Sequence, residues 1–388
     1  MVENHPVQYH APVYCAVQQK FGIPVTAVYG SDFSVRGYRD PEFGVHFSWD
    51  TDLLSGYTAQ FLSSVGSGKA ASFEEAPSRS LARMLEASRP KALLVSGYMR
   101  PVDRAAFFWG LRARIPTLFR AETTDHAIRR GPAKAWIRDQ LLRQFYGRCA
   151  ALLYIGKHSY QHYRRLGCPD RKLVFSPYAV DDGSFRCDES ARAQGRETTR
   201  ASLGFSPEHK VILFSGKLVA RKRPDLLLKA AGHLSKSGNG PWALLFMGDG
   251  ELRAELEEGA GTFPELPCRF IGFKNQTQMS PFYHAADLMV LPSAYSEPWG
   301  LVVNDALHHG VPCVVSEAVG CAPDLVKPGT TGEVFATDSL EQLESALLKM
   351  RPLLGDPGLR RQCRERVGGY TIGKAAEGIA KAYGEVTR

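Results

Sequence analysis

Residues 296–325 read S-E-P-W-G-L-V-V-N-D-A-L-H-H-G-V-P-C-V-V-S-E-A-V-G-C-A-P-D-L, and they follow an apolar run at 288–292. The run predicts a buried strand that ends at its proline, and 297–300 predicts a tight loop. A helix is expected over 301–309, because Gly310 stands where a left-handed cap closes a helix. The next residues are apolar throughout, as in a parallel strand buried on both faces. The stretch therefore predicts one strand–loop–helix–strand unit of a parallel α/β sheet.

This order of elements makes an anion site. The first backbone N–H groups of the helix, near Leu301 and Val302, point outward with the positive end of the helix dipole behind them. Gly300 lets a phosphate approach the backbone closely. A diphosphate would repel the carboxylates of Glu297 and Asp305, so both acids are expected to accept hydrogen bonds from hydroxyl groups on either side of it. A phosphate flanked by sugars is a nucleotide sugar.

The two acids are separated by seven residues, with P-W-G-L between them and G-V-P-C-V-V-S-E-A-V-G-C-A-P-D-L-V following. This pattern resembles the donor-binding signature of glycosyltransferase family 4, the retaining GT-B enzymes. The resemblance implies that Glu297 contacts hydroxyls of the donor sugar and that Asp305 contacts the nucleoside ribose. It also implies that the amides of Trp299, Gly300 and Leu301 contact the sugar and phosphate. The family usually has glutamate where this chain has Asp305, and a small shift or a bridging water can preserve the contact.

A second basic segment, S-G-K-L-V-A-R-K-R-P at 215–224, follows another predicted strand. Lysine serves phosphate as a point charge and arginine as a planar fork. A phosphate-binding turn is therefore predicted from Gly216, Lys217, Arg221 and Lys222. The segment resembles the basic pair with which the family neutralises the donor diphosphate, with Lys217 where arginine is common and Lys222 at the lysine.

The resemblance also assigns Gly272 and Phe273 to contact with the nucleobase, without separating uridine from guanosine or adenosine. In the mechanism that it implies, Glu297 lies at the reaction centre, and Lys217, Lys222 and the helix N-terminus stabilise charge on the leaving diphosphate. The leaving phosphate helps to deprotonate the acceptor on the same face of the sugar. The resemblance implies no cofactor, no metal and no enzyme nucleophile.

The N-terminal half offers weaker candidates. A loop at 4–10, N-H-P-V-Q-Y-H, resembles a cleft-facing loop of the family, so His5, Gln8 and His10 are candidates for donor or acceptor contacts. Isolated polar residues in a loop are more often structural, which is the alternative. A doubly wound domain has a full strand before such a loop, so we expect a first strand that is cut short.

Three further candidates follow a predicted strand at 116–120, namely Arg120, Glu122 and His126. Ligands bind at the carboxyl ends of strands in parallel sheets. Glu122 and His126 are therefore candidates to orient an acceptor or donor hydroxyl in catalysis, and Arg120 is a candidate on the acceptor side. A surface turn with a helix cap is the alternative.

Residues 30–75 show little periodicity and are rich in Gly, Asp, Ser and aromatic residues, which predicts an irregular rim on the acceptor side. Within it, Asp50-Thr51-Asp52 matches the D-x-D pattern of metal-dependent glycosyltransferases. Matches of three residues often arise by chance, and no metal site is predicted.

Charge is unevenly distributed along the chain. The whole excess of +8 lies in residues 1–185, with 24 Lys and Arg against 16 Asp and Glu, whereas residues 186–388 carry 24 of each. Much of the excess falls in one expected helix at 129–148. Its basic side chains are more often the solvated face of a core-packing helix, and contact with an anionic membrane surface or acceptor is the alternative. Nucleic acid is not an expected partner, because no basic stripe with interleaved aromatics continues along the chain.

The chain of 388 residues is long enough for two domains. A charged segment at 181–202, poor in aliphatic residues, predicts a linker. We expect an acceptor-side domain at 1–185, a nucleotide-sugar-binding domain at 186–370 and a C-terminal helix at 371–388. The resemblance implies an α/β fold of the GT-B type, with two Rossmann-like doubly wound domains facing a central cleft and the last helix crossing back to the first domain.

No apolar run approaches the length of about 18–20 residues that spans a bilayer, and the N-terminus lacks the apolar core of a signal peptide. The eight cysteines are scattered without a C-x-x-C pair, which favours reduced thiols. We therefore expect a cytoplasmic protein, in contact with the inner membrane face if the basic helix binds there.

The main functional prediction is a retaining, metal-independent glycosyltransferase that moves a sugar from a nucleoside-diphosphate sugar to a glycan or lipid-linked acceptor, in polysaccharide biosynthesis. One alternative is a nucleotide-sugar epimerase or hydrolase with the same phosphate contacts. The other is a non-catalytic subunit that binds nucleotide sugars.

Overall fold

Short runs of apolar residues form the parallel sheet of the first domain, because a strand covered by helices on both faces gains most from burying Val, Leu and Phe. The structure is a computed structural model and describes residues 1–39, 46–64, 78–125, 131–185 and 188–388. The sheet strands, in spatial order, are β5 (Thr58–Ser63), β2 (Thr26–Ser31), β1 (Val2–Glu3), β6 (Leu93–Val95), β7 (Thr117–Arg120), β8 (Ala151–Tyr154) and β9 (Leu173–Phe175).

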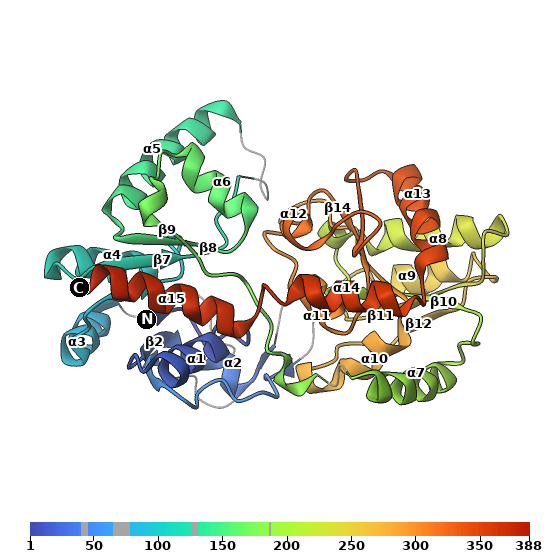
Figure 1. Cartoon of the computed structure of the whole chain (residues 1–388), viewed down its shortest axis with the longest axis horizontal. Helices are drawn as coiled ribbons and strands as arrows, with labels where there is room; N and C mark the ends of the chain where they lie inside the picture. The colour runs from blue at the N-terminus through green and yellow to red at the C-terminus, as the bar shows by residue number, and fades with distance from the viewer. Residues whose placement is uncertain (40–45, 65–77, 126–130, 186–187) are drawn as a thin grey trace.

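Helices flank this sheet (Figure 1). They are α1 (Ala11–Phe21), α2 (Phe33–Arg36), α3 (Ser78–Ser88), α4 (Pro101–Ala113), α5 (Pro132–Arg148) and α6 (Lys157–Arg165), with the small antiparallel pair β3 (Tyr38–Arg39) and β4 (His46–Phe47) beside them. The last helix of the chain, α15 (Ile372–Val386), returns to this domain. Its buried face, which includes Ala375 and Ile379, packs in the same core as α1. The predicted crossing of the last helix to the first domain is confirmed.

The second domain has the same architecture and contains a six-stranded parallel sheet. Its strands, in spatial order, are β12 (Cys268–Phe270), β11 (Trp242–Met247), β10 (Lys210–Ser215), β13 (Leu288–Leu291), β14 (Cys313–Ser316) and β15 (Gly332–Phe335). Around it lie α7 (Glu189–Leu203), α8 (Pro224–Lys236), α9 (Arg253–Ala260), α10 (Ser280–Ala285), α11 (Leu301–His308), α12 (Ala322–Leu325), α13 (Leu340–Met350) and α14 (Pro357–Val367). Short 3₁₀ turns join several elements, among them Ala220–Lys222 and Gln276–Gln278.

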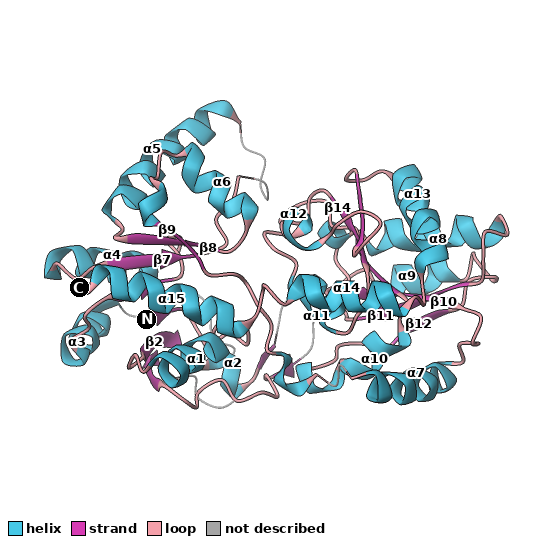
Figure 2. Ribbon diagram, in the orientation of Figure 1, coloured by secondary structure: helices cyan, strands magenta, loops and turns pink. Residues whose placement is uncertain are grey.

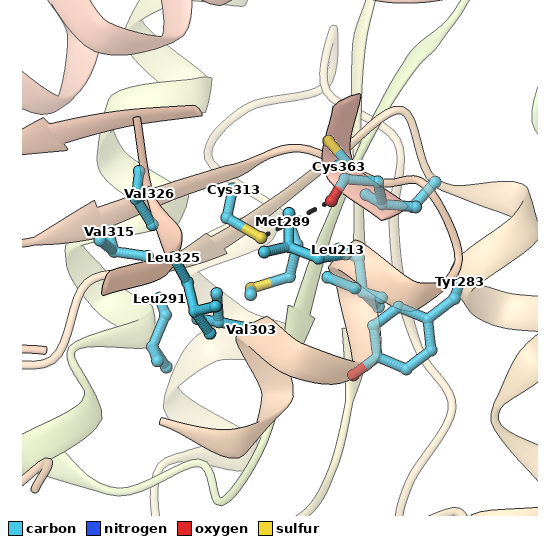
Figure 3. Packing of buried hydrophobic residues seen from close by; sticks show 14 of the residues in the cluster. Leu213, Tyr283, Met289, Leu291, Val303, Cys313, Val315, Leu325, Val326 and Cys363 are labelled. Atoms are coloured by element: carbon cyan, nitrogen blue, oxygen red, sulfur yellow. Dashed lines mark hydrogen bonds between the residues drawn. The ribbon is translucent and has the colours of Figure 1, made fainter. Parts of the chain in front are cut away.

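The core of the second domain holds α11 against its sheet. Met289 of β13, Val303 of α11 and Cys363 of α14 are all fully buried in one cluster (Figure 3). Because this packing fixes α11 on β13 and β14, the N-terminus of α11 is held in place at the carboxyl edge of the sheet. Strands, helices and loops of both domains follow the same layered plan (Figure 2), which confirms the predicted α/β architecture of two parallel-sheet domains.

Two elements refine the sequence-based expectations for the first domain. The expected short first strand is β1, which has two residues and pairs with both β2 and β6 in the middle of the sheet. The prediction that 30–75 is irregular is wrong for β5, which pairs in parallel with β2 over Thr58–Ser63. This edge strand is only half-buried, so its sequence T-A-Q-F-L-S lacks the apolar run that marks the central strands.

The two domains touch directly. The carboxylate of Asp324 in α12 accepts hydrogen bonds of 3.1 Å from the backbone N–H of Lys157 at the start of α6 and of 2.8 Å from the hydroxyl of Tyr370. A carboxylate at a helix N-terminus satisfies a free N–H group and opposes the positive end of the helix dipole. The segment that carries Asp324 is therefore a contact between the domains. None of the described helices is long and apolar enough to cross a bilayer.

Candidate functional site

A cavity of about 400 Å³ lies where the carboxyl ends of both sheets face each other. Eleven of the residues selected from the sequence line it: Gln8, Glu122, Gly216, Arg221, Lys222, Phe273, Glu297, Trp299, Gly300, Leu301 and Asp305. They come from loops that follow several different strands. Carboxyl strand ends are the usual ligand-binding edge of parallel sheets, so the cavity is the candidate active site.

The N-terminus of α11 opens on this cavity through Gly300. The residue has a φ of 95°, in the left-handed region that favours glycine, and a Cβ there would lie 2.9 Å from Cγ1 of Val319. Backbone and packing therefore both require glycine. Leu301, Val302 and Asp305 of the following helix also line the cavity. The free N–H groups of the first turn are thus available to an anion bound in it.

Lys222 and Glu297 form an ion pair inside the cavity. Nζ of Lys222 donates to Oε2 of Glu297, and the hydroxyl of Ser293 donates to the same oxygen over 3.0 Å. Both residues are largely buried, with exposed fractions of 9% and 8%. A diphosphate in the cavity would compete with Glu297 for the ammonium group, which would release the carboxylate to accept hydrogen bonds from sugar hydroxyls.

Asp305 presents a buried carboxylate to the same cavity. Within the described part of the chain, no hydrogen bond or ion pair satisfies its carboxylate, and its exposed fraction is 6%. Burial raises the pKa of Asp305 to about 8. A buried acid without a partner is costly, and two neighbouring hydroxyl groups of a ligand would supply the missing donors.

On the wall of the first domain, a chain of polar groups leads to Glu122. The hydroxyl of Tyr178 hydrogen-bonds to the carboxylate of Glu122 and lies 3.3 Å from Nε2 of His10. Nδ1 of His10 lies 2.7 Å from Oε1 of Glu3, which also accepts a 2.6 Å hydrogen bond from the hydroxyl of Tyr14. Burial raises the pKa of Glu122, although the hydrogen bond from Tyr178 opposes this effect.

Two glutamine side chains on the cavity wall can still accept a hydrogen bond. Among the described residues, nothing pairs with the side-chain oxygen of Gln8 or of Gln276, and both atoms are buried. Gln276 and Trp49 line the cavity but were not selected from the sequence. Tyr178 was also missed, although it stands just beyond the carboxyl end of β9, which is the position that marked Glu122.

Two further candidates, His5 and Arg120, lie outside the cavity lining. His5 packs against the ring of Phe33, and burial lowers the pKa of His5 to about 4. Arg120 is buried and donates to the backbone oxygens of Ser176 and Pro177.

Four further candidates from the sequence remain. Lys217 and Gly272 neighbour lining residues but are not among them, and His10 is buried behind the wall. His126 falls outside the described residues.

Hydrogen bonds within the protein occupy both acids of the D-x-D match. The carboxylate of Asp50 accepts hydrogen bonds from the backbone N–H and the hydroxyl of Thr277 in the second domain. Oδ1 of Asp52 accepts from the N–H groups of Leu54 and Ser55. In the described ranges, no group of three or more His, Cys, Asp and Glu side chains could hold a metal ion.

Each half of the chain matches a family model of glycosyltransferases. Residues 195–367 match the model of glycosyl transferases group 1, and residues 13–179 match the glycosyl transferase 4-like domain. D-inositol 3-phosphate glycosyltransferase of Mycobacterium marinum is 33% identical over 168 residues, which cover 41% of this chain and 34% of that protein. The Mycobacterium bovis protein of the same name is 32% identical over 175 residues. The match thus spans about a third of the length of these relatives.

Solved structures show the same fold over the whole chain. A glycosyltransferase from Rickettsia africae has a TM-score of 0.72 at 11% identity and covers 100% of this chain and 98% of its own. HepE of Anabaena in complex with UDP has a TM-score of 0.71 at 13% identity and covers 99% of this chain and 98% of its own. With both domains matched and the fold shared, the chain belongs to the group 1 glycosyltransferases of family 4 and has the GT-B fold.

Proposed function

We propose that this protein is a retaining glycosyltransferase that moves a hexose from a nucleoside-diphosphate sugar to a glycan or lipid-linked acceptor, in the assembly of a polysaccharide. The observation that carries the proposal is the cavity itself. In one space it joins a helix N-terminus, a buried Lys222–Glu297 pair and Asp305, whose carboxylate has no partner among the described residues. Those groups complement a diphosphate, a sugar and a ribose respectively.

Each part of the donor has a proposed set of contacts. Gly216, Arg221 and Lys222, with the N-terminus of α11, would hold the diphosphate. Glu297 would hold the sugar hydroxyls, and Asp305 the ribose. Gly272, Phe273, Lys217, Trp299 and Leu301 complete the proposed donor site.

In the proposed reaction, the bond between the anomeric carbon and the diphosphate oxygen breaks, and a bond to the acceptor oxygen forms on the same face of the sugar. The acceptor proton leaves on the departing diphosphate, so atoms and charge balance. Lys222 and the amides of α11 would stabilise the charge that accumulates on the leaving group, which is usually the largest catalytic effect of this kind. The proposal assigns this role to groups of the chain, so full activity is expected after treatment with EDTA.

The acceptor would enter from the side of Glu122. Its carboxylate lies on the cavity wall and is held by Tyr178, and the side-chain oxygen of Gln8, which has no partner among the described residues, offers a further hydrogen-bond acceptor. We propose that Glu122 orients an acceptor hydroxyl, with His10 and Arg120 supporting that wall from behind. His5 and His126 remain acceptor-side candidates from the sequence alone. A lipid-linked acceptor would bring the enzyme to a membrane surface while it works.

Thermal unfolding against nucleoside diphosphates and nucleotide sugars, among them UDP and UDP-glucose, tests the donor site. A ligand at a hundred times its dissociation constant stabilises the native state by about 2.7 kcal/mol. Lys222→Met should abolish the shift with both ligand classes, because it removes the cation from the diphosphate. Glu297→Gln should keep the shift with the diphosphate and lose the increment that the sugar adds. Lys217→Met should have the smaller effect of the two lysine variants, because Lys217 lies outside the lining.

Release of nucleoside diphosphate separates the proposal from its alternatives. A transferase releases it only when an acceptor is added, an epimerase does not release it, and a hydrolase releases it without an acceptor. A binding subunit shows the thermal shift and no turnover. If no nucleotide sugar shifts the unfolding of the parent protein, the donor site itself is refuted.

A further inference from the structure

Large apolar side chains gather on one exposed face of the first domain, formed by α4, α5 and the turn that precedes α4. Met99, Phe108, Trp136, Ile137 and Leu141 are exposed by 55% to 74%. A groove of about 800 Å³ runs between the two helices and is lined mainly by apolar groups. A single exposed apolar side chain needs no explanation, but a contiguous set of this size marks an interaction surface. We call this surface the α4–α5 face.

The α4–α5 face is also strongly cationic. The two helices carry Arg104, Arg112, Lys134, Arg138, Arg143 and Arg148. Their only acids are Asp103, which is buried, and Asp139, which pairs with Arg165 of α6 and with Arg138. Within the described part of the chain, the other five cations have no carboxylate partner. The face therefore presents apolar and positive groups together.

We propose that the α4–α5 face docks on an anionic lipid bilayer. Trp136, Ile137 and Leu141 would enter the boundary between headgroups and acyl chains, and the cations would lie against the lipid phosphates. Tryptophan suits this boundary because its ring is apolar and its N–H polar. Long arginine and lysine side chains can bury their stems along the apolar surface while their charged ends reach the headgroups.

The positive charge of the α4–α5 face favours an anionic bilayer over a second copy of the chain as its partner. A two-fold contact through this face would bring the same cations of both copies together, and like charges across an interface are repulsive. An anionic bilayer instead attracts these cations through its negatively charged headgroups. Docking through this face also suits the proposed function, and only this part of the argument rests on that function. Tyr98 and Met99, which line the groove, follow β6 at the carboxyl edge of the sheet where the cleft lies, so a docked enzyme would keep its acceptor side near the membrane.

Co-sedimentation with vesicles tests the proposal without any donor. The parent protein should bind vesicles of phosphatidylcholine and phosphatidylglycerol at low salt, and bind weakly to phosphatidylcholine alone or at high salt. Lys134→Gln/Arg143→Gln/Arg148→Gln should lower the partition coefficient on the order of a hundredfold, at roughly fivefold per near-surface cation. The matched control removes three exposed cations from helices of the second domain, Lys229→Gln/Lys236→Gln/Lys349→Gln, and should bind like the parent.

A second variant, Trp136→Ser/Leu141→Ser, tests the apolar part and should also weaken binding. Both side chains are exposed, so the thermal unfolding of the variant should match that of the parent. The proposal is overturned if the parent fails to bind anionic vesicles or if the cation variant binds as tightly as the matched control. It is also overturned if sedimentation velocity shows a dimer that Trp136→Ser/Leu141→Ser dissociates, since the face would then join two copies. Failure of nucleotide-sugar binding would refute the proposed function and leave the vesicle result unaffected.

Discussion

Asp305 makes donor binding depend on pH in a direction that the structure predicts. Its carboxylate is buried in the cavity, and burial raises its pKa to about 8. An ionised carboxylate can accept hydrogen bonds from two ribose hydroxyls, whereas a protonated one loses part of that capacity. We therefore expect the nucleotide sugar to bind the ionised form, so that affinity rises with pH until Asp305 is fully ionised.

The size of the effect follows from the ionised fraction. When only one form of a protein binds, the apparent dissociation constant is the intrinsic constant divided by the fraction of that form. With a pKa of about 8, the fraction rises roughly 25-fold from about pH 6.5 to about pH 8.5. Affinity should change about tenfold per pH unit at the lower end and level off above pH 9.

Isothermal titration calorimetry with an intact nucleotide sugar measures this profile. The intact sugar diphosphate is preferable to the free diphosphate, because a terminal phosphate has its own ionisation near pH 6. Asp305→Asn is the matched variant, since it keeps an acceptor oxygen at the same position but does not titrate. Its profile should be flat, and at about pH 8.5 its affinity should be roughly fivefold lower than that of the parent, because a charged hydrogen bond is worth about 1 kcal/mol more than a neutral one.

Two results would refute the reasoning. A flat profile in the parent protein would mean that Asp305 is not a donor contact or is already ionised at pH 6.5. A slope that persists in Asp305→Asn would mean that another group, such as Glu122, titrates instead.

Three predictions concern stability. Asp305→Asn should be more stable than the parent at about pH 8.5, by up to roughly 5 kcal/mol, but not at about pH 4. Because the pKa of Asp305 is raised in the native state, its contribution to the free energy of unfolding is complete below about pH 4 and is lost as the pH rises to about 8. Gly300→Ala should cost roughly 1–3 kcal/mol in urea unfolding, because of the φ of 95° and the approach to Val319. Asp324→Ala should cost roughly 1–3 kcal/mol, because it leaves the N–H of Lys157 without its acceptor; an unchanged midpoint would contradict either of these two.

The donor side of the site could be predicted because its parts are local in the sequence. Gly300 and the first turn of α11 lie within one strand–loop–helix unit, and each of its signals spans only a few residues. The basic turn that contains Lys222 is equally local. No local pattern predicts the ion pair between Lys222 and Glu297, because the two residues are 75 positions apart. Only the shared carboxyl edge of β10 and β13 brings them together.

The acceptor side was harder to predict for the same physical reason. Tyr178 joins Glu122 to His10, which precedes Tyr178 by 168 residues, and its role depends on the order of β1, β7 and β9 in the sheet. A tyrosine after a short strand has no distinctive signal of its own. Trp49 belongs to the segment whose composition predicted only an irregular rim, and its place at the cavity depends on contacts between the two domains.

The loop at 297–300 links donor binding to the contact between the domains. Two of its side chains have different partners: Glu297 pairs with Lys222 in the cavity, while the buried Trp299 donates to Asn304 over 2.9 Å and packs against Tyr178 of the first domain. A Cβ on Gly156 at the start of α6 would collide with the Trp299 ring. The loop that would hold the sugar is therefore clamped between both domains, so a movement of one domain on the other would displace the donor contacts directly. The contacts of Trp299 with the first domain thus help to set the position of Glu297 in the cavity.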